Sequence, residues 1–295
     1  MGVNHLQDLI GNTSLVSLDR LSSGSTSQIY AKLEMQNPSG SSMDRVVRNM
    51  LICSERRGEI TPGDTLIEAT SGSTGIALAM AATRRGYRVL LVITEDLPKE
   101  MRTTMTALGA ELIPTTDNSD IERARKLASE LENQGVGILL DQFSNPDNPD
   151  AHYKSTGPEI WNDSKGEITH FVSCMGTTGT IVGIGRYLKE KNPSIQVIGV
   201  RPIPGSRILG LNNWSSECLP NFYDPSFVDD IMEITPELAC ETVRRLIQQE
   251  GLFAGISSGA SVAAALRLCR RLDGAVVATI IADRGDRYLS TGIFD

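Results

Sequence analysis

The sequence predicts an α/β protein with two open, twisted, mostly parallel sheets that carry helices on both faces. Short, continuous apolar runs alternate with helical periodicities along the chain, which is typical of parallel strands covered on both sides. A stretch rich in Pro and Asn, residues 144–150, interrupts this alternation and separates two series. The chain has 295 residues and 40% hydrophobic content, which is enough for a large core and two domains.

The first series predicts a sheet with helices between its strands. Strands are expected at the β-prone segments 65–69, 87–93, 110–115 and 137–143. Helices are expected between them, at residues 76–85, 98–108 and 120–133. Gly86 is typical of a residue that ends a helix, and Pro98 of a residue that opens one.

The second series repeats this pattern. Strands are expected at residues 168–175, 196–202, 230–235 and 275–282. Helices are expected up to residue 191, over 236–250 and over 257–272. Ser257 or Ser258 is expected to be the N-cap of the last helix. The irregular segment 203–229 is typical of a surface loop, although loops of this length often border a functional site.

We expect the two series to form two domains. The smaller N-terminal α/β domain would comprise residues 37–149, and the larger one residues 1–36 together with 150–295. Ligands of open α/β sheets bind outside the carboxyl ends of the strands. The sequence therefore predicts a site in a cleft between the two domains.

Composition excludes several classes of function. The formal net charge of −8 disfavours sequence-independent nucleic-acid binding and binding to an anionic membrane surface, since both need a basic face. The five cysteines are odd in number and widely spaced, so we expect free thiols in a reducing compartment. Because neither a signal peptide nor a membrane span is expected from the sequence, we expect a cytosolic protein.

Two loops of small residues could bind anions. "MGTTGT", residues 175–180, lies between an expected strand and an expected helix, where glycines admit a phosphate and the helix N-terminus offers free N–H groups. "TSGSTG", residues 70–75, could hold a carboxylate in the same way. An ordinary tight turn before a helix remains the alternative for each loop.

Other motifs are incomplete. No Gly-Lys-Ser/Thr follows the glycines, which excludes a Walker loop, and "GIGRYL" lacks the third glycine of a dinucleotide fingerprint. "GISSG" resembles the hydrolase elbow around Ser257, but that fold needs a histidine after the serine. All three histidines, His5, His152 and His170, precede it and lie far apart, so they are expected to be structural or surface residues and no metal site is expected.

Together, eight segments resemble one known family. They are "IGNTSLV", "NPSGSSMDR", "GDTLIEATSGSTGIALA", "DQFSNPDNP", "STGPEIW", "MGTTGT", "GISSGA" and "DRGDRYLSTGIF". In this order they resemble the fold-type II pyridoxal phosphate (PLP) enzymes, and among these the O-acetylserine sulfhydrylases, especially their B-isozyme group. The resemblance covers residues 10–294 and implies a fold like that of the tryptophan synthase β-subunit, a homodimer and an amino-acid substrate.

The resemblance also implies site residues. In the family, a lysine holds PLP as a Schiff base and serves as the base, acetate leaves the substrate, and a sulfur nucleophile adds to give cysteine. The PLP phosphate would be cradled by Gly176, Thr177, Thr178, Gly179 and Thr180, and Ser257 would face the pyridine nitrogen. The substrate carboxylate would be held by Thr70, Ser71, Gly72, Thr74 and Gln142.

The sequence departs from the family pattern at the most important position. The pattern N-P-x-G-S-x-K-D-R has Met43 where the lysine belongs, and a thioether can neither form an imine nor take a proton. Ser73 stands where the family has an Asn that touches the PLP ring oxygen. Further departures from the family are Ser14, Asn212, Asn213 and Ala282.

Several interpretations remain open. We predict a cysteine-forming enzyme of this family that is inactive or severely impaired, in which PLP binds without a covalent bond or is absent. An engineered Lys-to-Met variant of an active enzyme is the first alternative. A non-catalytic pseudoenzyme that binds PLP or another ligand, or regulates a partner, is the second, and a different enzyme that uses the same pocket is the third.

Overall fold

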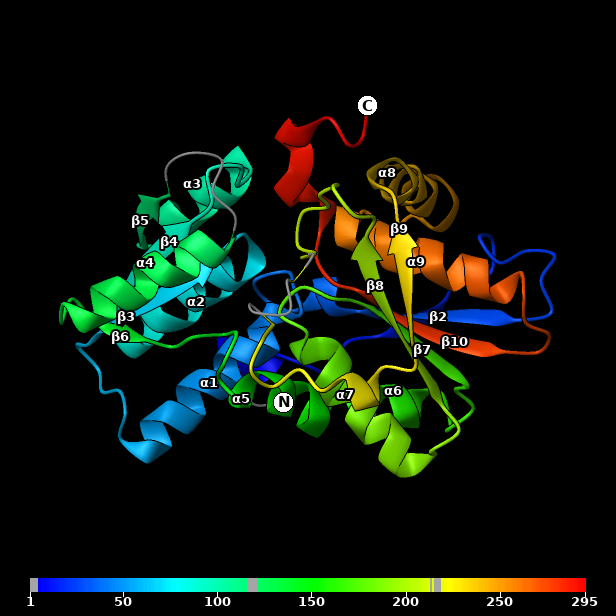
Figure 1. Ribbon diagram of the computed structural model, residues 1–295, viewed down its shortest axis with the longest axis horizontal. Coiled ribbons are helices and arrows are strands. Elements are labelled where there is room, and N and C mark those ends of the chain that lie inside the picture. Colours follow the sequence, from blue (N-terminus) through cyan, green and yellow to red (C-terminus); the bar gives the residue numbers. More distant parts are fainter. Residues whose placement is uncertain (1–4, 116–120, 213, 215–218) are drawn as a thin grey trace.

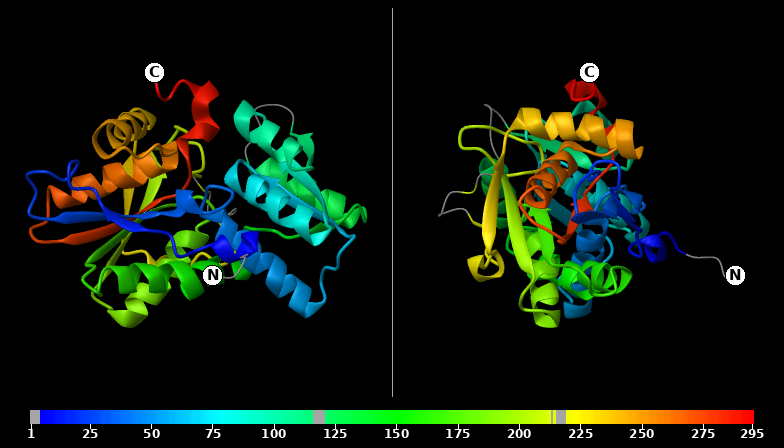
Figure 2. Two further views of the ribbon diagram at one scale, coloured as in Figure 1. Left: turned by 180° about the vertical axis from the view of Figure 1, so that it is seen from behind. Right: turned by 90° about the vertical axis from the view of Figure 1, so that its right-hand side faces the viewer.

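The computed structural model describes residues 5–115, 121–212, 214 and 219–295. It contains two separate sheets, which lie side by side in Figure 1 and, seen from behind, in the left view of Figure 2. One sheet has four strands in the order β5-β4-β3-β6, and the other has six in the order β1-β2-β10-β7-β8-β9. The predicted fold class, α/β with two mostly parallel sheets, is confirmed.

The four-stranded sheet is parallel throughout. Its strands are β3 (Thr65–Thr70), β4 (Arg88–Ile93), β5 (Glu111–Pro114) and β6 (Ile138–Leu139). Successive residues of a strand point to opposite faces, so Leu66 packs with α2 (Ser73–Arg85) and α3 (Lys99–Ala107), whereas Ile67 packs with α4 (Ile121–Asn133). Helices therefore cover both faces of this sheet.

The six-stranded sheet is parallel except for the pair β1–β2. Its strands are β1 (Leu15–Ser17), β2 (Gln28–Leu33), β7 (His170–Cys174), β8 (Gln196–Pro202), β9 (Asp230–Ile234) and β10 (Val276–Ile281). Figure 1 shows helices on both faces of this sheet. They are α8 (Pro236–Arg245) and α9 (Ile256–Cys269) on one face, and α6 (Gly157–Asp163) and α7 (Gly179–Lys191) on the other.

Several elements differ from the sequence prediction. The strands β1 and β2 were not expected, and β6 is shorter than the expected strand at 137–143. The Pro- and Asn-rich stretch contains the short helix α5 (Asp147–Ala151), followed by a π-helical turn. That turn is η3 (His152–Thr156), and a second π-helical turn is η5 (Leu246–Glu250). The short 3-10 helices are η1 (Leu6–Leu9), η2 (Glu34–Gln36), η4 (Pro225–Phe227) and η6 (Gly285–Thr291). The domain boundaries at 36/37 and 149/150 stay a prediction.

The predicted N-cap of α9 is wrong. Gly255 is the N-cap residue, and both Ser257 and Ser258 lie inside the first turn. The Ser258 hydroxyl accepts a hydrogen bond of 3.0 Å from the Ala282 N–H instead of capping the helix. A Cβ atom at Gly255 would lie 2.1 Å from Asp283 Oδ1, so the serine that would normally cap the helix has no room there.

A buried cluster of charges fixes the start of α1 (Met43–Arg57). Arg45 contacts Glu34 at 2.7 Å and Glu159 at 2.6 Å, and Lys32 contacts Glu159 at 2.9 Å. We call these four residues the buried ion cluster. It joins β2, η2, α1 and α6, so the first turn of α1 is anchored to the six-stranded part of the molecule.

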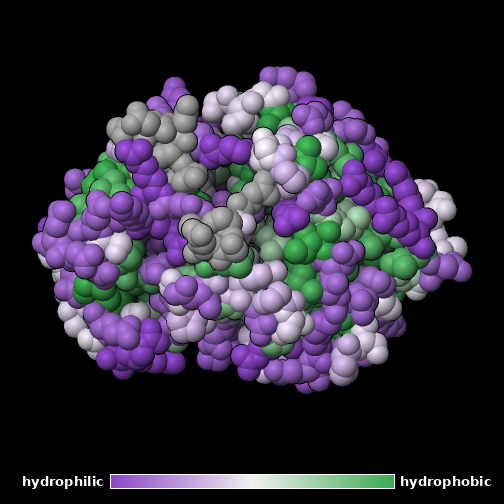
Figure 3. Space-filling view, in the orientation of Figure 1, coloured by the Kyte–Doolittle hydropathy of each residue, from purple (hydrophilic) through white to green (hydrophobic). Residues whose placement is uncertain are grey.

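No helix in the described ranges is long and apolar enough to cross a membrane. On the face shown in Figure 3, hydrophilic residues cover most of the surface and apolar ones form several patches.

We expect Arg45→Met to lower the free energy of unfolding by about 3–5 kcal/mol, because Glu34 and Glu159 would lose a buried counter-charge. Urea denaturation followed by circular dichroism measures the change. The control is Arg57→Met on the same helix, whose side chain is 43% exposed and whose loss should cost at most about 1 kcal/mol. Equal losses for the two variants would contradict a special role of the buried ion cluster.

Candidate functional site

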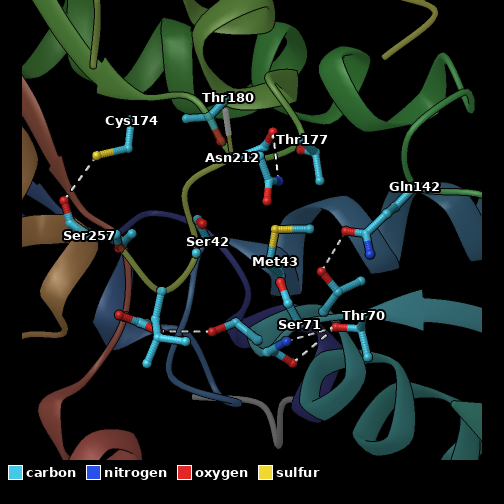
Figure 4. Close-up of a pocket in the computed structure, with 18 of the residues that line it drawn as sticks. Ser42, Met43, Thr70, Ser71, Gln142, Cys174, Thr177, Thr180, Asn212 and Ser257 are labelled. Carbon is cyan, nitrogen blue, oxygen red and sulfur yellow. Dashed lines mark hydrogen bonds between the residues drawn. The ribbon is translucent and has the colours of Figure 1, made fainter. Parts of the chain in front are cut away.

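One cavity brings the predicted site residues together (Figure 4). Its walls come from the starts of α1 and α9, the loops after β3 and β7, the segment 209–212 and the C-terminal segment. All predicted site residues except Gly179 line it: Met43, Thr70, Ser71, Gly72, Ser73, Thr74, Gln142, Gly176, Thr177, Thr178, Thr180 and Ser257. Gly179 instead packs against Asn148, whose Oδ1 would lie 2.0 Å from a Cβ at this glycine.

The phosphate loop, Gly176–Thr180, follows β7 and includes the first two residues of the 13-residue helix α7. Thr178 has a left-handed backbone (φ 67°), and its buried Oγ1 has no hydrogen-bond partner among the described residues. A Cβ at Gly176 would lie 2.6 Å from the Gly210 carbonyl oxygen, so only glycine fits. Free N–H groups, the helix dipole and a free hydroxyl in one cavity are suited to a phosphate.

His152 contacts this loop without lining the cavity. Its Nε2 lies 3.2 Å from Thr180 Oγ1, and its Nδ1 lies 2.9 Å from Thr156 Oγ1. The imidazole is fully buried, and burial lowers the pKa of His152 to about 4. The expectation of a structural histidine is confirmed, but its contact with the loop has no signal in the sequence. No group of metal-ligating side chains occurs in the described ranges.

The loop after β3 forms the opposite wall. The Thr70 hydroxyl accepts hydrogen bonds from the N–H groups of Gly72 (3.1 Å) and Gly75 (3.3 Å), so it shapes the loop itself. Thr74 donates to Gln142 Oε1 at 2.7 Å, and Gln142 Nε2 donates to the Ala69 carbonyl at 2.7 Å. The side chain of Gln142 also forms a hydrogen bond with the buried Glu68 carboxyl group.

Glu68 holds Gln142 in place. This fully buried carboxylate accepts hydrogen bonds from the backbone N–H of Ala69 (3.0 Å) and of Gln142 (3.2 Å). Burial, and then the nearby Asp141 charge, raise the pKa of Glu68 well above its usual value. The sequence analysis missed this residue, although a glutamate inside an apolar strand is itself a signal.

A second network connects α2 to the C-terminal segment. Ser73 Oγ donates to Asp283 Oδ2 at 3.0 Å and accepts from Arg287 Nη1 at 2.6 Å. The Tyr288 hydroxyl also donates to Asp283 Oδ2, at 2.7 Å, and burial raises the pKa of Asp283. Since a serine has one hydroxyl hydrogen, Ser73 has no proton left to donate to a cofactor. The sequence analysis missed Asp283, Arg287 and Tyr288 as site residues.

Met43 is the first residue of α1, and its half-buried side chain lines the cavity. In Figure 4 it lies between Thr177 and Ser71, which belong to the two opposite loops. The described lining contains no lysine, arginine or histidine, and Asp283 is its one carboxylic acid.

The wall near α9 is polar but not ionised. Ser257 lines the cavity, and its carbonyl oxygen accepts a hydrogen bond of 3.1 Å from the Cys174 thiol. Burial raises the pKa of Cys174 to about 12, which makes it a poor nucleophile. Of the other departures from the family pattern, Asn212 and Ala282 line the cavity, Ser14 does not, and Asn213 lies outside the described residues.

Residues 6–283 match the family model described as "Pyridoxal-phosphate dependent enzyme". The chain belongs to this family. It is 52% identical to cysteine synthase B of Pseudomonas aeruginosa, over 98% of this chain and 97% of that protein. It is 51% identical to cysteine synthase B of Escherichia coli, over 98% and 95%. A solved cysteine synthase from Entamoeba histolytica superposes with a TM-score of 0.90 at 34% identity, over 100% and 91%.

These similarities confirm the resemblance to fold-type II PLP enzymes that the sequence motifs indicate. PLP dependence is a property of the family. The phosphate loop fits such a group, because Thr178 leaves a buried hydroxyl unpaired where the helix N-terminus meets the cavity.

We expect His152→Gln to weaken the pH dependence of stability between pH 4 and 6.5. The pKa of His152 is about 4 in the folded chain and about 6.5 when unfolded, so the unfolded state takes up the proton first as the pH falls. The free energy of unfolding therefore decreases from pH 6.5 to 4, and this decrease should shrink in the variant. Urea titrations over this pH range measure it, with exposed His5→Gln as the control. An unchanged slope in His152→Gln would contradict a buried neutral imidazole.

Proposed function

We propose that this chain is a cysteine synthase B-like protein that binds PLP without a covalent bond and forms cysteine only at a severely reduced rate. The observation that carries the proposal is Met43, which lines the cavity at the position of the family's lysine and has no amine. The described lining offers no other lysine to replace it.

The proposed cofactor contacts follow the walls of the cavity. The N–H groups and hydroxyls of Gly176, Thr177, Thr178 and Thr180 would hold the phosphate, with Gly179 opening the helix behind them. Ser257 would face the ring nitrogen, where a hydroxyl leaves the ring uncharged. Ser73 would lie near the ring oxygen as an acceptor only, because it donates its one hydroxyl hydrogen to Asp283.

The opposite wall would orient an amino-acid ligand. Its carboxylate would be bound by Ser71, by the N–H groups of the loop and by Gln142, which lines the cavity and which Thr74 and Glu68 hold in position. Thr70 would act by shaping the loop that contains Gly72. When bound, PLP would supply the electron sink for loss of acetate and addition of a sulfur nucleophile.

Proton transfer is the step that this chain lacks. A methionine thioether is neutral and cannot hold the α-proton of a substrate, and loss of a general base alone reduces a rate by about 10²–10⁴. Loss of covalent attachment to PLP would lower the rate further.

A second candidate function is a ligand-binding or regulatory pseudoenzyme. It is supported by a complete phosphate loop together with a residue 43 that cannot act as a base. By family resemblance, we propose a homodimer for either function.

We expect Met43→Lys to gain an absorbance band of lysine-linked PLP that the chain as given lacks, because only an amine can bond the PLP aldehyde. Cysteine formation from O-acetylserine and sulfide should rise at least about 10²-fold in the same variant. Absorbance spectra and a steady-state assay measure the two effects. Met43→Gln, similar in length and without an amine, is the control. Cysteine formation by the unmodified chain at the rate of its active relatives would overturn the proposal.

A further inference from the structure

We propose that Ser73 is the nucleophile of a second activity of this cavity, the hydrolysis of small carboxylic esters, with Asp283 as its base. This inference goes beyond the proposed function, because it needs neither PLP nor an amine at residue 43. It rests on the contacts of the Ser73 hydroxyl and on the place of this residue at the start of α2.

The Ser73 hydroxyl lies between a carboxylate and a guanidinium. Its Oγ donates a hydrogen bond of 3.0 Å to Asp283 Oδ2 and accepts one of 2.6 Å from Arg287 Nη1. The carboxylate is placed to take the hydroxyl proton, and the guanidinium stabilises the negative charge that then develops on the oxygen. Both contacts therefore favour attack of this oxygen on a carbonyl carbon.

The base is itself held in place. Asp283 is 3% exposed and lines the cavity, and the Tyr288 hydroxyl donates to the same Oδ2 at 2.7 Å. A nucleophile within hydrogen-bond reach of a base, which a third group orients, is the arrangement that activates serine in nucleophilic catalysis. Burial raises the pKa of Asp283, which makes this carboxylate a better proton acceptor than an exposed aspartate.

The start of α2 provides donors for the oxyanion that forms during acyl transfer. Ser73 and Thr74 are the first two residues of this helix, and both line the cavity. No helical carbonyl can pair with their N–H groups, and the positive end of the helix dipole lies there. Oxyanion holes of serine hydrolases use the backbone N–H of the nucleophile itself or of the residue after it.

The wall beside the nucleophile is suited to a short, uncharged acyl group. Met43 and Met101 both line the cavity, and each ends in an apolar thioether. Met101 Sδ would lie 3.3 Å from a Cβ at Gly72, the residue before the nucleophile, so space for the acyl chain is limited there. The expected substrates are therefore esters of acetate or of an acid of similar size.

The reaction balances with water as its only other reactant. Ser73 Oγ bonds to the ester carbonyl carbon while its proton moves to Asp283 Oδ2. The ester C–O bond then breaks, and the departing alcohol takes this proton from Asp283. Water attacks the acyl group on Ser73 and gives a proton to Asp283, which passes it to Ser73 Oγ as the carboxylic acid leaves. The products are one alcohol and one carboxylic acid.

The test uses the full-length protein without added PLP, with p-nitrophenyl acetate as the probe. The chain should release p-nitrophenolate in a burst followed by steady turnover, which absorbance measures. Acid quenching during turnover should trap one acetyl group, and fragmentation in mass spectrometry should place it on Ser73.

Variants test the two assigned roles. Ser73→Ala should lower the hydrolysis rate at least about 10²-fold and abolish the acetyl label, and Asp283→Asn should lower the rate to a similar extent. Ser73→Cys should keep an acetyl label at this position, because a thiol is also a nucleophile. The control is Ser23→Ala, an exposed serine outside the cavity, which should leave the rate unchanged.

The outcomes distinguish this inference from the proposed function. If Ser73→Ala hydrolyses the ester as fast as the unmodified chain, or if the acetyl group is on another residue, the inference is wrong. If circular dichroism shows that Asp283→Asn does not fold, the acetyl label on Ser73 of the unmodified chain still decides. A chain that binds PLP but does not hydrolyse the ester would leave the proposed function standing and overturn this inference.

Discussion

The buried ion cluster is the constraint on which the position of the site depends. Arg45 is held on two sides by Glu34 and Glu159, and it lies two residues after Met43. Because breaking one buried ion pair leaves an unpaired charge in the interior, the first turn of α1 cannot shift without a large loss of stability. The fixed position of Arg45 therefore directs residue 43 into the cavity, independently of the chemical nature of the side chain at position 43.

Two helix N-termini then determine what the cavity can bind. The loops before α2 and α7 meet across Met43, and each has N–H groups that no helical carbonyl can pair. Behind them, Glu68 holds the backbone of Gln142, and His152 contacts Thr180. These supports are hydrogen bonds to buried groups, so they keep the loops in shape without a ligand.

The parts of this arrangement with local signals could be predicted from sequence. Continuous apolar runs identified β3, β4, β7, β8 and β10, and small-residue loops identified both walls of the cavity. Contacts between distant residues could not be predicted. Ser73 and Asp283, which share a hydrogen bond, are 210 positions apart. The N-cap of α9 depended on the distant Ala282, whose N–H donates a hydrogen bond to the Ser258 hydroxyl. The three-residue strand β1 was too short to show a period.

The network around Asp283 connects these observations to residue 43. A buried carboxylate needs a compensating partner, and an ammonium at residue 43 would have placed a positive charge in the same lining. With Met43 that charge is absent, and Arg287 compensates Asp283 indirectly, through the hydroxyl of Ser73. Ser73 therefore links the charge of Arg287 to the Asp283 carboxyl group in a cavity whose described lining contains no lysine.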